Sequence, residues 1–171
     1  HKVVESCGIK KGMAIADIGA GTGLYTRLFA KETGPDGWVY AVDISAPFLK
    51  HIVARAQQEC QQNISAILSP ENVTPLPANS LDMAFICDTY HHFEYPKGTM
   101  DSLLRALKKG GALVVIDFER IEGKTRKWTM GHVRAGKEVF RKEIEDAGLT
   151  FVEEVKLEGL KENYFLRFRK E

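Results

Sequence analysis

Short apolar runs alternate with stretches of helical periodicity along most of the chain. The apolar runs have the length and the β-branched or aromatic content of buried strands. They lie at residues 13–18, 38–42, 64–68, 83–87 and 113–118. The stretches between them carry apolar residues three or four positions apart, which is typical of helices with one buried face. These helical stretches lie at residues 24–31, 45–60 and 100–107, and we expect Gly110-Gly111 to end the last of them. Strands that alternate with helices predict an α/β fold built on a parallel sheet.

The C-terminal part of the chain departs from this alternation. A helical pattern over residues 137–147 precedes two strand-like segments, 151–157 and 163–169, which are joined by a short loop. In the second segment, apolar and arginine positions alternate with a period of two. This pattern predicts an antiparallel hairpin at the edge of the sheet.

Composition and length indicate one ordinary globular domain over residues 1–171. The first residue is His1 rather than Met, so an upstream extension stays open. No apolar run approaches the roughly 20 residues that a membrane-spanning helix needs. Three scattered cysteines, Cys7, Cys60 and Cys87, do not form a disulfide framework or a zinc pattern. We expect them to be buried free thiols in a reducing, cytoplasmic compartment.

Candidate chemistry is expected where the predicted strands end, because parallel sheets bind ligands beyond the carboxyl ends of their strands. The first strand runs into Asp17-Ile18-Gly19-Ala20-Gly21-Thr22-Gly23. Alternate glycines let the backbone turn sharply and approach a ligand closely, and the helix that follows presents free N–H groups to an anionic group. The last glycine of the dinucleotide pattern G-x-G-x-x-G would fall at Leu24. That substitution disfavours a nicotinamide-dependent oxidoreductase, which we keep as a third option.

Asp43 closes the second predicted strand. A carboxylate in this place can accept hydrogen bonds from both hydroxyl groups of a ribose. The alternative is that Asp43 only caps the next helix, but Ser45 can already fill that role. We therefore interpret Asp43 as a ribose ligand.

Together with two further segments, these features make the chain resemble the class I S-adenosylmethionine (SAM)-dependent methyltransferases. The glycine loop, Asp43, Leu76-Pro77-Ala78-Asn79-Ser80-Leu81-Asp82 and Leu107-Lys108-Lys109-Gly110-Gly111 occur in the order and spacing of that family. The resemblance covers nearly the whole chain. It implies a Rossmann-like sheet of seven strands in the order 3-2-1-4-5-7-6, mostly parallel with strand 7 antiparallel, and helices on both faces. It also implies SAM as methyl donor and S-adenosylhomocysteine as product.

The resemblance distributes the cofactor site over the ends of the strands. The glycine loop would pass under the methionine part of SAM, Asp43 would hold the ribose, and the segment after the third strand would reach the adenine amino group. The cofactor-binding residues that it implies are Asp17 near the ammonium group, Gly19, Ala20, Gly21 and Thr22 in the loop, Asp43 at the ribose, Ile44 on the adenine, Glu71 or Asn72 at the amino group, and Asp88 facing the sulfonium.

The acceptor side is expected just beyond the fourth strand. His91 and His92 are the candidate catalytic bases, because histidine titrates near neutrality; packing or capping is the alternative role for each. His132, before the last helix, can approach the acceptor from above. Residues 88–91 lack the prolines of the Asn/Asp-Pro-Pro-Tyr signature of nucleobase aminomethyltransferases. We therefore expect a small-molecule acceptor. The metal-dependent, catechol-type enzymes of this class place acidic and amide ligands beyond the fourth strand; because we find no such set here, we expect no metal.

Two alternatives to a small-molecule methyltransferase stay open, and the first concerns charge. The net charge of +1 disfavours a nucleic-acid partner, but residues 120–142 hold eight lysines and arginines against two glutamates. A solvated face is the default interpretation of such a segment, and the alternative is recognition of an RNA or protein acceptor. A non-catalytic module that binds SAM or S-adenosylhomocysteine is the second alternative.

Overall fold

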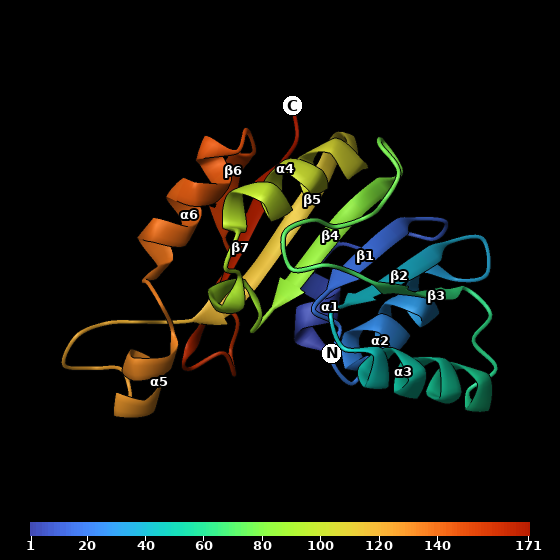
Figure 1. The fold of residues 1–171 in the computed structure, drawn as a ribbon, viewed down its shortest axis with the longest axis horizontal. Helices are drawn as coiled ribbons and strands as arrows, with labels where there is room; N and C mark the ends of the chain where they lie inside the picture. Colours follow the sequence, from blue (N-terminus) through green and yellow to red (C-terminus); the bar gives the residue numbers. More distant parts are fainter.

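A sheet of seven strands runs through the computed structural model, which describes residues 1–171 (Figure 1). The strands are β1 (Ala14–Ile18), β2 (Trp38–Asp43), β3 (Ile64–Leu68), β4 (Leu81–Cys87), β5 (Leu107–Phe118), β6 (Thr150–Glu154) and β7 (Asn163–Arg169). Their order is β3-β2-β1-β4-β5-β7-β6. β7 runs antiparallel to both β5 and β6, and all other neighbours are parallel. The predicted α/β class, strand order and antiparallel seventh strand are confirmed.

Helices cover both faces of this sheet. They are α1 (Lys2–Ser6), α2 (Leu24–Thr33), α3 (Ala46–Gln58), the 3₁₀ turn η1 (Tyr90–His92), α4 (Pro96–Ala106), α5 (Lys127–His132) and α6 (Lys137–Asp146). α1 and α2 pack on one face, where Phe29 meets Ile15 and Phe85. α4 and α6 pack on the other face, where Met100 and Phe140 join the larger core cluster. None of these helices combines the length and the hydropathy that a bilayer crossing requires.

The expected end of the fourth-strand crossover helix, α4, was wrong. Gly110-Gly111 does not end a helix: α4 stops at Ala106, and both glycines lie inside β5. Leu107 pairs with Leu81, and the register then shifts, so the glycines occupy an irregular stretch of strand. A side chain at Gly111 would lie 2.8 Å from the Lys108 carbonyl oxygen, which explains why glycine occurs within this strand.

The thiol prediction was wrong for Cys60. α3 ends at Gln58, and Cys60 lies beyond it with a φ of 54° and an exposed side chain. Cys7 is buried, Cys87 is partly buried, and all three cysteines are free. The apolar stripe of α3 therefore ends at Ala56, which is buried with Ile52.

α5 is an element that the pattern of the sequence did not predict. It follows β5 and lies apart from the other helices, at the lower left of Figure 1. Only Thr129 within it is buried, and Trp128 is 59% exposed. This short helix carries His132 as its last residue, and its position decides what that side chain meets.

Candidate active site

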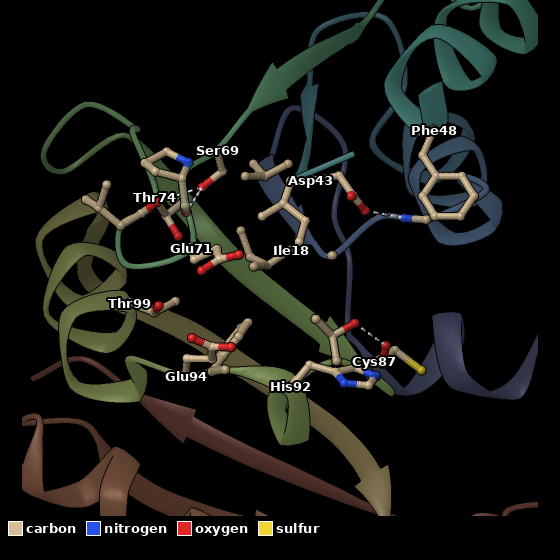
Figure 2. A pocket seen from close by; sticks show the side chains of 18 of the residues that line it. Ile18, Asp43, Phe48, Ser69, Glu71, Thr74, Cys87, His92, Glu94 and Thr99 are labelled. Carbon is tan, nitrogen blue, oxygen red and sulfur yellow. Dashed lines mark hydrogen bonds between the residues drawn. The ribbon is translucent and has the colours of Figure 1, made fainter. Parts of the chain in front are cut away.

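A cavity of about 580 Å³ opens at the carboxyl ends of β1, β2 and β4 (Figure 2). β1 lies between β2 and β4, so the order of the strands reverses here, and open α/β sheets bind ligands at such a point. The lining residues come from the strand ends and the loops that follow them: Ile18, Gly19, Gly21, Val42, Asp43, Ile44, Phe48, Ser69, Pro70, Glu71, Val73, Thr74, Cys87, Asp88, Thr89, His92, Phe93, Glu94 and Thr99.

The glycine loop forms one wall of this cavity. Gly19 has a φ of +70°, and its N–H donates to the Val42 carbonyl at 2.8 Å, which holds the loop against the end of β2. A Cβ atom on Gly19 would lie 2.3 Å from Cγ2 of Thr89. Glycine is therefore required both by the backbone conformation and by the close approach of the β4 end.

The third glycine of the loop packs helices together. A Cβ atom on Gly23 would lie 2.6 Å from Cγ1 of Ile52 in α3. Close packing is the role that the dinucleotide pattern assigns to its last glycine, and here Gly23 fills it one position before Leu24. Leu24 itself begins α2 and is 53% exposed.

Asp43 connects β2 with the glycine loop. Its Oδ2 accepts from the Gly21 N–H and its Oδ1 from the Ser45 N–H, both at 2.8 Å. Each carboxylate oxygen keeps a second lone pair, and Asp43 lines the cavity. Ser45 caps α3, its hydroxyl accepting from the Phe48 N–H. Asp43 is thus available to a ligand without being the cap.

Asp17 lies beneath the loop and not among the lining residues. Its side chain is 3% exposed, and Oδ2 accepts a hydrogen bond from the Thr26 hydroxyl at 2.6 Å. Burial, opposed in part by this hydrogen bond, raises the pKa of Asp17 to about 6. Its contact with a ligand ammonium group stays a prediction.

The other expected cofactor residues divide into two groups. The cavity is lined by Gly19, Gly21, Asp43, Ile44, Glu71 and Asp88, and not by Asp17, Ala20, Thr22 or Asn72. Sequence reasoning missed several lining residues, among them Phe48, Thr74 and Thr99. Phe48 carries a usable signal, because it falls in the first turn of the helix that follows Asp43 and is 45% exposed.

The end of β4 places two titratable side chains, Cys87 and Asp88, in the cavity wall. Asp88 has a φ of 50°, and its Oδ1 accepts from the Asn163 side chain at 2.8 Å. Partial burial and then the nearby Asp117 carboxylate raise the pKa of Asp88. Burial also raises the pKa of the Cys87 thiol. Because the thiolate is the reactive form, Cys87 is a neutral wall residue and not a nucleophile.

The two candidate bases occupy different environments. His92 is exposed and lines the cavity. Partial burial, then His91 and His132, lower the pKa of His92, so its imidazole is neutral at physiological pH. The His91 side chain is 1% exposed, lies outside the lining set, and its Nδ1 is 2.7 Å from Oδ1 of Asp117. Tyr90 is fully buried, and its hydroxyl donates to Glu143.

Acidic partners neutralise much of the basic segment 120–142. Arg126 pairs with Glu162, which lies outside that segment, at 2.7 Å. The remaining ion pairs are those of Arg134 with Glu143, Lys137 with Glu119 and Glu154, Arg141 with Glu145, and Lys142 with Asp146. The charge excess that the sequence shows over 120–142 is therefore offset by carboxylates from neighbouring elements.

Comparison with known proteins agrees with this architecture. A family model described as a methyltransferase domain matches residues 16–115. The ubiquinone/menaquinone biosynthesis C-methyltransferase UbiE of Pseudomonas paraeruginosa is 32% identical over 120 residues, which are 68% of this chain and 46% of that protein. The chain thus spans about half the length of the curated relatives it matches.

Solved structures extend the similarity to nearly the whole chain. A SAM-dependent methyltransferase from Aquifex aeolicus superimposes with a TM-score of 0.88 at 26% identity, covering 98% of this chain and 87% of that one. The [4+2]-cyclase SpnF shares the fold alone, with a TM-score of 0.86 at 15% identity over 99% of this chain and 78% of its own. The family match, the sheet order and the cavity at the ends of β1, β2 and β4 lead to one conclusion: the chain belongs to the class I SAM-dependent methyltransferase family.

Proposed function

We propose that the chain binds SAM in the cavity at the ends of β1, β2 and β4 and transfers its methyl group to a small-molecule acceptor. The observation that carries this proposal is the Asp43 carboxylate, which is oriented by two backbone N–H groups and keeps lone pairs for a ribose. The shape of the site fits the group, because Gly19 and Gly21 place bare backbone at the cavity wall, where a ligand can approach it closely. Bound there, SAM supplies a methyl group on a positively charged sulfur.

The residues of the chain would act mainly by positioning. Methyl transfer needs the acceptor atom in line with the carbon–sulfur bond, and orientation of this kind contributes several kcal/mol. Ile44 and Phe48 are exposed apolar side chains at the cavity, which suits contact with a flat base. We assign the acceptor contact to His92, because it reaches the cavity, and place His91 behind it.

A small acceptor is favoured by the relatives and by the charge of the molecule. The curated relatives are named for C-methylation in ubiquinone and menaquinone biosynthesis. The basic segment 120–142, which carries the alternative of an RNA or protein acceptor, is largely paired with carboxylates.

Isothermal titration calorimetry with SAM tests the cofactor site. We expect Asp43→Ala to weaken SAM binding by about 10- to 100-fold, because two charge-assisted hydrogen bonds to the ribose, each of roughly 1.5–3 kcal/mol, are lost in part or whole. Asp36→Ala, which removes an exposed carboxylate in the turn before β2, is the matched control and should bind as the unmodified chain does. Unchanged affinity of Asp43→Ala would refute the proposed site, as would NADH binding without SAM binding.

A labelling experiment separates an enzyme from a binding module. Cell extract incubated with the protein and methyl-labelled SAM should yield one labelled small molecule by mass spectrometry. Binding of SAM without any labelled product in extract or in a broad panel of acceptors would favour the non-catalytic alternative.

A further inference from the structure

Three imidazoles from two separate parts of the chain converge beside the cavity. His91 and His92 form the end of η1, and His132 is the last residue of α5. One ring nitrogen of each lies within 4.8 Å of the corresponding nitrogen of both others. The ring centroid of His91 is 4.0 Å from that of His92 and 5.0 Å from that of His132. Nothing in the proposed methyl transfer requires three clustered imidazoles.

His91 is held in one orientation by a buried carboxylate. Asp117 is 0% exposed and accepts from the His91 backbone N–H at 3.1 Å and from the Phe118 N–H at 2.7 Å. It also lies 2.7 Å from Nδ1 of His91. Because a carboxylate oxygen accepts hydrogen bonds, the tautomer that fits this pair carries its proton on Nδ1, which leaves the lone pair on Nε2, on the opposite side of the ring from Asp117.

That lone pair has no partner within the protein. Nε2 of His91 is buried and makes no hydrogen bond. An unsatisfied buried polar atom costs roughly 1–3 kcal/mol, and in a native protein it indicates that an ion or ligand completes the site. His92 and His132 each place a ring nitrogen within 4.8 Å of a ring nitrogen of His91.

We propose that His91, His92 and His132 bind one divalent transition-metal ion of the Zn²⁺ class. Neutral imidazole is a preferred ligand of such ions. A buried carboxylate on the far nitrogen of a ligating histidine is the usual outer support of a zinc site, and Asp117 takes that place behind His91. The inference replaces our expectation from the sequence that the protein needs no metal.

The geometry allows the site to close with small side-chain movements. Metal–nitrogen distances of about 2.0–2.1 Å place tetrahedral ligands roughly 3.3 Å apart. His92 and His132 are exposed, so rotation of their side chains can bring their ring nitrogens closer to the fixed His91 ring. Trp128 stacks on His132 with a centroid distance of 4.5 Å and an interplanar angle of 22°, which limits how far that ring turns.

Three protein ligands leave a coordination position open. Sites of three ligands with a free position are typical of catalytic zinc, whereas structural zinc has four protein ligands. Because His92 also lines the SAM cavity, the open position lies on the acceptor side. The ion would thus hold an acceptor through an oxygen or nitrogen lone pair. This last role rests on the proposed function, whereas metal binding itself does not.

Titration with Co²⁺ as a spectroscopic substitute for Zn²⁺ tests the site directly. The protein, first treated with a chelator, should bind one equivalent of Co²⁺ with the intense visible absorption of tetrahedral coordination, and Zn²⁺ should displace it. We expect His132→Ala and His92→Ala each to weaken binding at least tenfold, and Asp117→Asn by about 10- to 100-fold. His51→Ala, an exposed histidine on α3, is the matched control and should leave the titration unchanged.

Calorimetry with SAM on the same samples separates this proposal from the proposed function. His132→Ala should bind SAM as the unmodified chain does, which also shows that the variant is folded. No stoichiometric cobalt site, or one that survives both His92→Ala and His132→Ala, would overturn the metal site while leaving SAM binding intact. If the unmodified chain did not bind SAM, the proposed function would be overturned. The cobalt titration would still confirm or refute the metal site, because it does not depend on SAM.

Discussion

Gly19 and Gly12 adopt similar backbone conformations in different surroundings. Their φ angles are +70° and +82°. A Cβ atom on Gly19 would collide with Thr89 at 2.3 Å, whereas one on Gly12 would meet nothing within 4 Å. An alanine at Gly12 would incur only the cost of a left-handed backbone, roughly 1–2 kcal/mol for an L-residue. An alanine at Gly19 would incur that cost and would also push the glycine loop away from Thr89 at the end of β4.

We predict that Gly19→Ala weakens SAM binding at least tenfold and that Gly12→Ala leaves it unchanged. Both variants should lose stability, because both adopt a left-handed φ. Calorimetry with SAM and thermal unfolding check the two quantities. If both variants bound SAM equally well, the approach of the loop to the β4 end would have no bearing on the cofactor site.

Asp17 should make the stability of the protein depend on pH. Its pKa is raised from 3.8 to about 6 by burial, so the folded state holds the proton more tightly than the unfolded state. The free energy of unfolding therefore falls as pH rises from about 4 to about 6, and the full cost is present above that range. A shift of this size corresponds to about 3 kcal/mol.

The variant Asp17→Asn tests this pH dependence. Asparagine keeps an oxygen that accepts from the Thr26 hydroxyl but does not titrate. Measured by urea unfolding, its stability relative to the unmodified chain should increase by about 2 kcal/mol between pH 4.5 and pH 7.5. A difference that stays constant over this range would show that Asp17 is not the buried acid responsible.

At the scale of elements, one side chain ties α2 to the start of β3. The side-chain nitrogen of Asn63 is buried and donates to the carbonyl oxygens of Ala30 and Gly34, both at 2.9 Å. These carbonyls lie at the C-terminal end of α2, where each also accepts one backbone N–H, from Gly34 and Gly37 respectively. The Asn63 amide therefore supplies a second hydrogen bond to each oxygen. Asn63 thus ends one element and positions the next.

We predict that Asn63→Ala lowers the free energy of unfolding by about 2 kcal/mol, because two buried hydrogen bonds of roughly 1 kcal/mol each are lost. The neighbouring Gln62 is exposed, so Gln62→Ala is a matched control and should change stability by less than about 0.5 kcal/mol. Urea unfolding of both variants measures this. Equal stability of the two variants would mean that water replaces the amide without cost.

For the whole molecule, the distribution of charge decides between acceptor classes. Carboxylates from α6, β6 and the loops neutralise most cations of segment 120–142, while Arg120, Lys124 and Lys127 form no ion pair. We predict no saturable binding of poly(U) by fluorescence anisotropy at about 0.15 M salt, since affinity for a polyanion depends on unpaired cations. Saturable binding with a steep salt dependence, abolished by Lys124→Glu with Lys127→Glu, would instead favour an RNA acceptor.

Much of the fold was predictable because it depends on local patterns. Strand and helix periodicities located β1 to β5, α2, α3 and α6, and the period of two in residues 163–169 located β7. α5 was missed because its six residues are too few for a helical period and only Thr129 is buried. The end of α4 was misplaced because glycine marks both helix ends and irregular strands, and only the pairing of Leu107 with Leu81 decides between them.

The sequence by itself determined that Gly19, Gly21 and Asp43 share one site, because the carboxyl ends of neighbouring parallel strands meet at one edge of a sheet. Only the tertiary structure decided that Asp17 turns toward Thr26 and that Phe48 and Thr74 reach the cavity. It alone brought His132 to His91. No periodicity relates residues so far apart in the chain, and their contact depends on how β5 and the loop after it place α5 over η1.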